Sequence, residues 1–134
     1  MPVFTSLSGA DALAVQLREN NTNILLLRFT ATWCGPCKRI NPVVDSWVQS
    51  LPSDILFYQL DVDENPEMYS FLKSKRRVNG IPALLCYSRG NHSYIPDECV
   101  VGADVNEVRR FFEKCRVLHQ KNQDESATSS SSFR

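Results

Sequence analysis

The chain has 134 residues, of which 43% are hydrophobic and 22% are charged, a composition typical of one globular domain and not of a disordered segment. Fifteen basic and fifteen acidic side chains cancel, so no overall field draws the chain to nucleic acid or to an anionic membrane. No apolar run reaches the roughly 18 residues of a membrane span and no signal-peptide pattern opens the sequence, so we expect a cytoplasmic protein.

The first half of the chain alternates between helical and strand patterns. Apolar residues at helical spacing predict a helix over about residues 9–20, and the apolar run from Ile24 to Thr30 predicts a central strand buried on both faces. An amphipathic helix is expected from Gly35 to about Leu51, and a second buried strand from Ile55 to Asp63.

The second half continues with a helix, two strands and a final helix. Asn65, as N-cap, and Pro66 predict a helix that runs to about Lys75. A strand is expected over 81–87 and a short one around 99–101, before a helix that opens at Asp104 and ends near His119. The order predicts an α/β fold with a parallel core, helices on both faces and an antiparallel edge.

The last residues differ from the rest in composition. Residues 120–134 are polar and rich in serine, so we expect them to be disordered. The predicted organisation is therefore one domain over 1–119 and a tail over 120–134.

Five cysteines form one close pair, Cys34 and Cys37, and three separate residues. An odd count does not indicate the disulfide framework of a secreted domain. Zinc would need further soft or imidazole ligands, but the other cysteines are isolated and the only histidines, His92 and His119, lie far apart in the sequence. The pair is therefore interpreted as a redox dithiol.

The position of the pair, after a strand and at the start of a helix, explains how it would react. Unpaired N–H groups and the helix dipole favour a thiolate at Cys34, which makes it the nucleophile, while Cys37 is the resolving thiol. Gly35 lets a substrate backbone approach, and Pro36 fixes the first turn. Trp33 either offers a flat apolar surface to a partner or packs in the core.

Four motifs in order, WCGPCK after a buried strand, then DVDENP, GIPALL and VGAD, resemble those of thioredoxins over roughly residues 5–118. The resemblance implies the thioredoxin fold, a central mixed sheet flanked by four helices, and a monomeric enzyme that reduces disulfides in protein partners. It implies no bound cofactor, electrons from a separate flavin-dependent thioredoxin reductase, and a role in electron transport and cell redox homeostasis.

The resemblance also assigns the substrate-binding residues. The bond between Ile81 and Pro82 should be cis and face the dithiol, and the backbone beside it should pair with the substrate. Gly102 and Ala103 match the residues that complete an apolar docking rim in similar proteins.

Two positions depart from the family pattern. Arg28 stands where thioredoxins carry a buried aspartate that assists proton removal from the resolving cysteine, and Gln59 stands where they carry a lysine. A buried guanidinium is costly, so Arg28 either has a partner, for which Asp61, Asp63 and Glu64 are the candidates, or extends its head group to water along its long stem. Arg28 either tunes the dithiol, making it more oxidising while water accepts the Cys37 proton, or is an ion-paired structural residue.

These departures leave two alternative functions open: a more oxidising isomerase or oxidase tuned by Arg28, and a non-catalytic binding module. Among the remaining cysteines, Cys86 and Cys115 are expected in the core, and Cys99 is expected to be the most exposed, with its pKa raised by acidic neighbours. A basic run is interpreted as a solvated helix end or as a site for acidic partners; it comprises Lys73, Lys75, Arg76 and Arg77.

Overall fold

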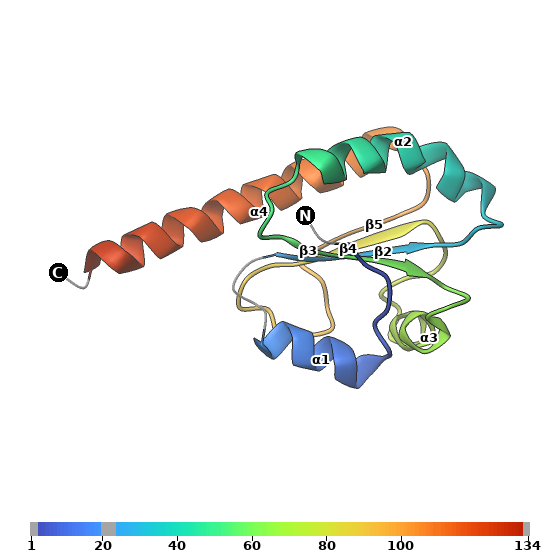
Figure 1. The fold of residues 1–134 in the computed structure, drawn as a ribbon, viewed down its shortest axis with the longest axis horizontal. Coiled ribbons are helices and arrows are strands. Elements are labelled where there is room, and N and C mark those ends of the chain that lie inside the picture. Colours follow the sequence, from blue (N-terminus) through green and yellow to red (C-terminus); the bar gives the residue numbers. More distant parts are fainter. Residues whose placement is uncertain (1–2, 20–23, 133–134) are drawn as a thin grey trace.

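The structure, a computed structural model, describes residues 3–19 and 24–132, with side chains described up to residue 125. A five-stranded mixed sheet lies between two layers of helices (Figure 1). The strands are β1 (Val3–Phe4), β2 (Leu25–Thr30), β3 (Leu56–Asp61), β4 (Ala83–Tyr87) and β5 (Glu98–Val101). The helices are α1 (Ala10–Glu19), α2 (Gly35–Ser50), α3 (Pro66–Ser74) and α4 (Val105–Ser132).

The sheet has the order β1-β3-β2-β4-β5, with β2 in the centre. Strands β1, β3 and β2 run parallel, whereas β4 is antiparallel to β2 and β5 is antiparallel to β4. This confirms the predicted α/β fold with a parallel core and an antiparallel edge. Only β1 was not predicted, because two residues are too short to show a periodic pattern.

Strand β2 separates the two hydrophobic layers by alternation of its side chains. Leu25, Leu27 and Phe29 pack in the cluster that includes buried residues of α1 and α3. Leu26 packs in the other cluster, with residues of α2 and α4. Arg28 lies two residues further along the strand, so its side chain leaves the sheet on the same face as Leu26. Figure 1 shows these helix pairs on opposite faces of the sheet.

Helix α4 extends beyond its predicted end. The prediction that it ends near His119 is wrong; of residues 120–134, which were expected to be disordered, 120–132 are helical and 133–134 lie outside the described residues. The extension begins with polar contacts: Gln123 donates to Asp54 at 3.3 Å, and buried Asn122 lies 3.5 Å from the hydroxyl of Ser88. Contacts between polar side chains do not produce the periodic pattern of apolar residues that predicts a helix, so the sequence did not indicate this extension. No helix in the described part of the chain is long and apolar enough to cross a bilayer.

Asn65 links the N-terminal segment to the end of β3. It occupies the predicted N-cap position of α3, but its side chain makes no capping bond to that helix. Its Oδ1 instead accepts the N–H of Leu7 at 3.1 Å, and its Nδ2 donates to the carbonyls of Thr5 and Asp61. The side chain therefore fixes the loop that follows β3, on which part of the site depends.

Replacing this buried amide should destabilise the fold. In Asn65→Ala the Leu7 N–H loses its acceptor inside the protein, and we expect the free energy of unfolding to fall by about 1–3 kcal/mol in urea denaturation. Asn106→Ala, at an exposed position of α4, is the control and should change it by less than about 0.5 kcal/mol. Equal unfolding midpoints for the two variants would contradict the assigned role of Asn65.

Candidate active site

Cys34 and Cys37 lie at the start of helix α2, which follows the central strand β2 after a short loop. Cys34 is the N-cap of this helix, and its Sγ accepts the backbone N–H of Cys37 at 3.2 Å. The two residues form a disulfide with their Cα atoms 5.3 Å apart. The geometry thus places both sulfurs at the positive end of a 16-residue helix, as the sequence predicted.

The pair is largely covered by neighbouring apolar side chains. Cys34 is 4% exposed and Cys37 is 1% exposed, and both pack with Ala31. Val62 and Ile81 complete this small cluster from other parts of the chain. The access that remains lies mainly at Cys34, beside the exposed residues Gly35 and Pro36.

Trp33 lies at the surface next to the dithiol. It is 65% exposed, and its Nε1 donates to Oδ2 of Asp63 at 2.8 Å. Of the two interpretations from the sequence, the core-packing one is therefore wrong. The hydrogen bond from the loop after β3 holds the indole while its ring remains open to solvent.

The segment before β4 approaches the dithiol from a distant part of the sequence. The peptide bond between Ile81 and Pro82 is cis, as the family resemblance implied, and Ile81 packs against the cysteine cluster. The N–H of Gly102 donates to the carbonyl of Pro82 at 2.9 Å. Gly102 has a φ of 109°, in the region that favours glycine, and Ala103 follows it. The structure thus brings Ile81, Pro82 and Gly102 to one region.

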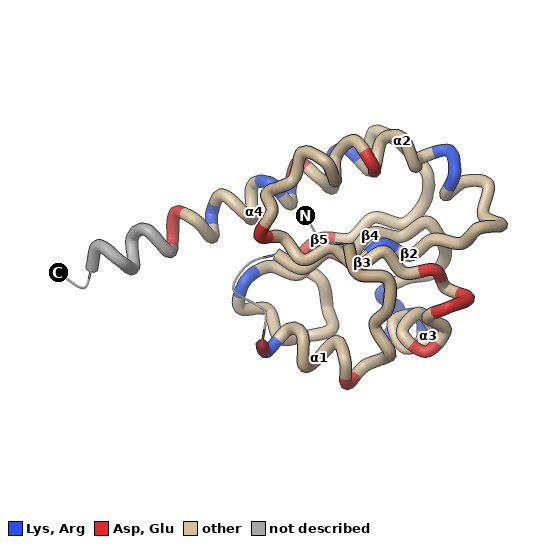
Figure 2. Tube along the Cα trace, in the orientation of Figure 1, with Lys and Arg blue, Asp and Glu red and all other residues tan. Residues whose placement is uncertain are grey.

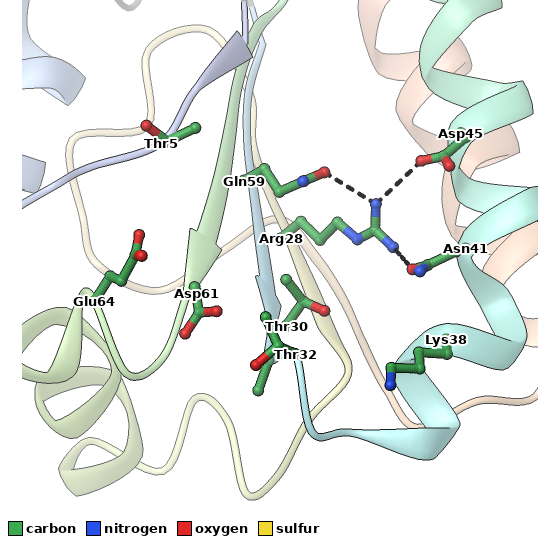
Figure 3. Close-up of a pocket in the computed structure, with 11 residues that line it drawn as sticks. Thr5, Arg28, Thr30, Thr32, Lys38, Asn41, Asp45, Gln59, Asp61 and Glu64 are labelled. Atoms are coloured by element: carbon green, nitrogen blue, oxygen red, sulfur yellow. Dashed lines mark hydrogen bonds and ion pairs between the residues drawn. The ribbon is translucent and has the colours of Figure 1, made fainter.

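Arg28 is buried and binds residues of helix α2, not the predicted carboxylates. Its Nη1 lies 3.3 Å from Oδ1 of Asp45 and 3.0 Å from Oε1 of Gln59, and its Nη2 donates to Asn41 (Figure 3). The expected partners Asp61, Asp63 and Glu64 were therefore wrong. Arg28 pairs in register with Gln59, two residues before Asp61, and its side chain points across to α2.

The expected carboxylates have other places in the structure. Oδ1 of Asp61 accepts the N–H of Asp63 at 2.8 Å, and Asp63 holds Trp33. Sequence reasoning missed Asn41 and Asp45, the residues that bind Arg28. Their four-residue spacing, which places two polar residues on one face of α2, is the signal that would have indicated them.

Arg28 lines a polar pocket of about 360 Å³ that also reaches Ala31 and Lys38. Burial lowers the pKa of Arg28, and the nearby carboxylate of Asp45 opposes this shift. Within the described residues its Nε has no hydrogen-bond partner. A cation thus lies beneath the strand end that carries the dithiol, and it is partly balanced by Asp45.

The other three cysteines separate as predicted into two buried thiols and one exposed thiol. Cys86 and Cys115 lie in the core between the sheet and α2 and α4, and a contact with Cys86, together with burial, raises the pKa of Cys115. The pKa of Cys99 is also raised, but the cause differs from the predicted one: desolvation dominates, and the charge of Arg77 opposes it. Among the described residues no group of three or more His, Cys, Asp or Glu side chains could hold a metal ion.

The chain is similar to known thioredoxins in both sequence and fold. The family model described as Thioredoxin matches residues 9–114. Thioredoxin-2 of Saccharomyces cerevisiae is 40% identical over 88 residues, which are 66% of this chain and 79% of the yeast protein. Thioredoxin H2 of Arabidopsis thaliana is 30% identical over 102 residues, 76% of this chain and 69% of the plant protein. The solved structure of Trichomonas vaginalis thioredoxin matches with a TM-score of 0.62 at 29% identity, covering 85% of this chain and 96% of that chain.

The environments of the three free cysteines predict different labelling rates. With the Cys34–Cys37 disulfide intact, iodoacetamide should modify Cys99 slowly at pH 7, because its raised pKa keeps the thiolate scarce. The rate should rise about tenfold per pH unit between pH 7 and 8. Cys86 and Cys115 should react only after unfolding, so native Cys99→Ser should take up no label, as followed by mass spectrometry. A rate at Cys99 that levels off below pH 8 would contradict the raised pKa.

Proposed function

Because this chain belongs to the thioredoxin family and is a thiol–disulfide oxidoreductase that uses Cys34 and Cys37, we propose that it reduces disulfides in protein substrates, with Cys34 attacking and Cys37 resolving. The observation that carries this assignment of roles is the position of Cys34 at the N-cap of α2, where its sulfur accepts the N–H of Cys37. This backbone N–H, as a hydrogen-bond donor, and the positive end of the helix dipole both stabilise the negative charge of a thiolate at that sulfur.

The reaction proceeds in two exchange steps. The Cys34 thiolate attacks one sulfur of the substrate disulfide, so that a mixed disulfide forms and the other substrate sulfur leaves as a thiolate that takes up a proton. Cys37 then loses its proton and attacks the Cys34 sulfur, which releases the second substrate thiol. Two electrons pass to the substrate, and the protein is left with the Cys34–Cys37 disulfide, the form seen in this structure.

The substrate docks on the surface around the covered pair. Trp33 supplies an exposed ring, Gly35 and Pro36 allow close approach, and Ile81 and Pro82 together with Gly102 and Ala103 form the rest of the docking surface. Exposure of Trp33 and the hydrogen bond from Gly102 to Pro82 support this arrangement. Main-chain groups beside Pro82 pair with an extended substrate segment.

Regeneration of the dithiol requires an external source of two electrons. A separate flavin-dependent enzyme of the thioredoxin reductase type supplies them. Thioredoxins need no bound cofactor, because the two cysteines themselves carry the electrons. The protein acts as a monomer in the cytoplasm, in electron transport and cell redox homeostasis; membership of the thioredoxin family supports the redox role.

A second candidate, a more oxidising isomerase or oxidase, is favoured by the position of Arg28. Its buried guanidinium binds Asn41 and Asp45, four and eight residues after Cys37 on the same helix. It also shares its pocket with Ala31, which packs on both cysteines. A positive charge there stabilises a thiolate, which favours the reduced form and makes the couple more oxidising.

Serine variants test the roles of the two cysteines. Cys34→Ser should abolish reduction of insulin with dithiothreitol as electron source, because the attacking thiolate is lost. Cys37→Ser should accumulate a mixed disulfide with the substrate, visible on a non-reducing gel, since no thiol resolves it. Cys99→Ser is the matched control and should keep the wild-type rate. Full biological activity of a Cys34→Ser, Cys37→Ser protein would instead support a binding module.

Replacement of Arg28 tests whether its charge makes the dithiol more oxidising, as the second candidate function requires. Arg28→Met removes the cation, and the reduction potential measured against glutathione should become more negative by on the order of 10–30 mV. Arg28→Lys keeps the charge and should remain near the wild-type potential. If Arg28→Met leaves both the potential and insulin turnover unchanged, Arg28 is only a structural link between β2 and α2.

A further inference from the structure

A basic groove lies beside the proposed docking surface, where α3 ends and the chain turns towards β4. Its cavity measures about 570 Å³ and contains three cationic side chains, Lys73, Arg76 and Arg77. Val78, Asn79 and Val101 complete its lining. The name basic groove is used below for this set of six residues.

The cations of the basic groove are not neutralised by neighbouring acids. In the described part of the chain no ion pair joins any of the three to a carboxylate. Lys73 and Arg76 are exposed, although the Nζ of Lys73 lies 5.9 Å from the centroid of the Tyr69 ring. Among the described residues the guanidinium of Arg77 makes one hydrogen bond, from its Nε to the carbonyl of Lys75 at 2.9 Å, and its charge acts on Cys99. A helix C-terminus favours cations in its last turn, but Arg76 and Arg77 lie beyond α3, and Arg76 has a φ of 58°. Unpaired charge therefore remains available to a ligand.

Two residues that line the basic groove are close neighbours in sequence of residues proposed to bind the substrate. Asn79 precedes Ile81 by two residues, and Ile81 packs against the cysteine cluster. Val101 immediately precedes Gly102, whose N–H is bonded to Pro82. A substrate held at Pro82 would thus place its flanking residues over the basic groove.

The loop that follows β3 carries charge of the other sign. Asp61, Asp63 and Glu64 follow one another closely at the end of β3, and Asp63 holds Trp33. Figure 2 shows acidic positions along this loop and basic positions behind α3. The surface near the cysteines therefore carries clusters of both signs although the whole chain has no net charge.

We propose that the basic groove binds an acidic segment of the protein substrate that flanks the disulfide being reduced. This inference rests on the proposed reduction of protein disulfides and adds the class of substrate. Carboxylates suit the site because a guanidinium can hold one through two parallel hydrogen bonds. The acidic loop near Trp33 would repel the same segment, so the charges also fix the direction in which the substrate lies.

Three peptides that share one disulfide test the proposal. In the acidic peptide the disulfide is flanked by Asp and Glu, in the neutral peptide by Ser and Gly, and in the basic peptide by Lys. Pre-reduced protein is mixed with each peptide, and the second-order rate constant is measured by acid quench and chromatography. Wild-type protein should reduce the acidic peptide about tenfold faster than the basic one at low ionic strength. The ratio should approach one at about 1 M salt, where charges are screened within roughly 3 Å.

A second experiment reverses the charge of two residues in the basic groove. Lys73→Glu, Arg76→Glu should abolish or invert the preference and leave the rate for the neutral peptide within about twofold of wild type. Arg109→Glu, Lys121→Glu, at exposed positions of α4, changes the net charge equally and should keep the preference. Circular dichroism checks that each variant is folded.

The outcomes separate the two proposals. Equal wild-type rates for the acidic and basic peptides, or the same loss of preference in both double variants, would overturn the basic groove as a binding site. Reduction of none of the three peptides by wild-type protein would instead overturn the proposed function. The wild-type preference and its salt dependence decide the matter even if a variant fails to fold.

Discussion

The burial of strand β2 is the constraint on which the site depends. The strand pairs with β3 on one edge and β4 on the other, and helices cover both of its faces, so every side chain on it must find a partner inside the protein. The Leu and Phe side chains do so by packing, but Arg28 does so by binding Gln59 on the next strand and Asn41 and Asp45 on α2. One strand thereby both delivers Cys34 to the start of α2 and fixes that helix from beneath.

The chemistry follows from where this strand ends. Cys34 meets the N-terminus of α2, and the pair is enclosed by a small apolar cluster completed by Val62 and Ile81. The surroundings of that cluster are polar and include an acidic loop that holds Trp33 and, beyond Ile81 along the chain, the basic groove. The apolar centre holds the reactive sulfurs, and the proposed role of the surrounding charges is to select which substrates approach them.

Features that depend on local sequence pattern could be predicted, and features that depend on long-range polar contacts could not. The buried runs of β2 and β3, the amphipathic α2 and the position of Cys34 at its start were all visible in residue periodicity. The partner of Arg28 was predicted wrongly because Asp45 lies on α2, and the spacing of Asn41 and Asp45 marks a polar face of that helix but does not show that this face turns towards β2. The same limit hid the contacts of Asn122 and Gln123 that accompany the extension of α4, and the use of Asn65 as a link to Leu7.

The central claim, that two electrons pass between a substrate disulfide and the Cys34–Cys37 pair, is tested most directly by disulfide mapping during turnover. Fully reduced protein is mixed with a disulfide-containing protein, quenched at intervals, alkylated and analysed by mass spectrometry. The account predicts one new Cys34–Cys37 disulfide for each substrate disulfide lost, with Cys86, Cys99 and Cys115 remaining thiols. Substrate reduction without matching formation of that disulfide, or with a bond at Cys99 in its place, would contradict it.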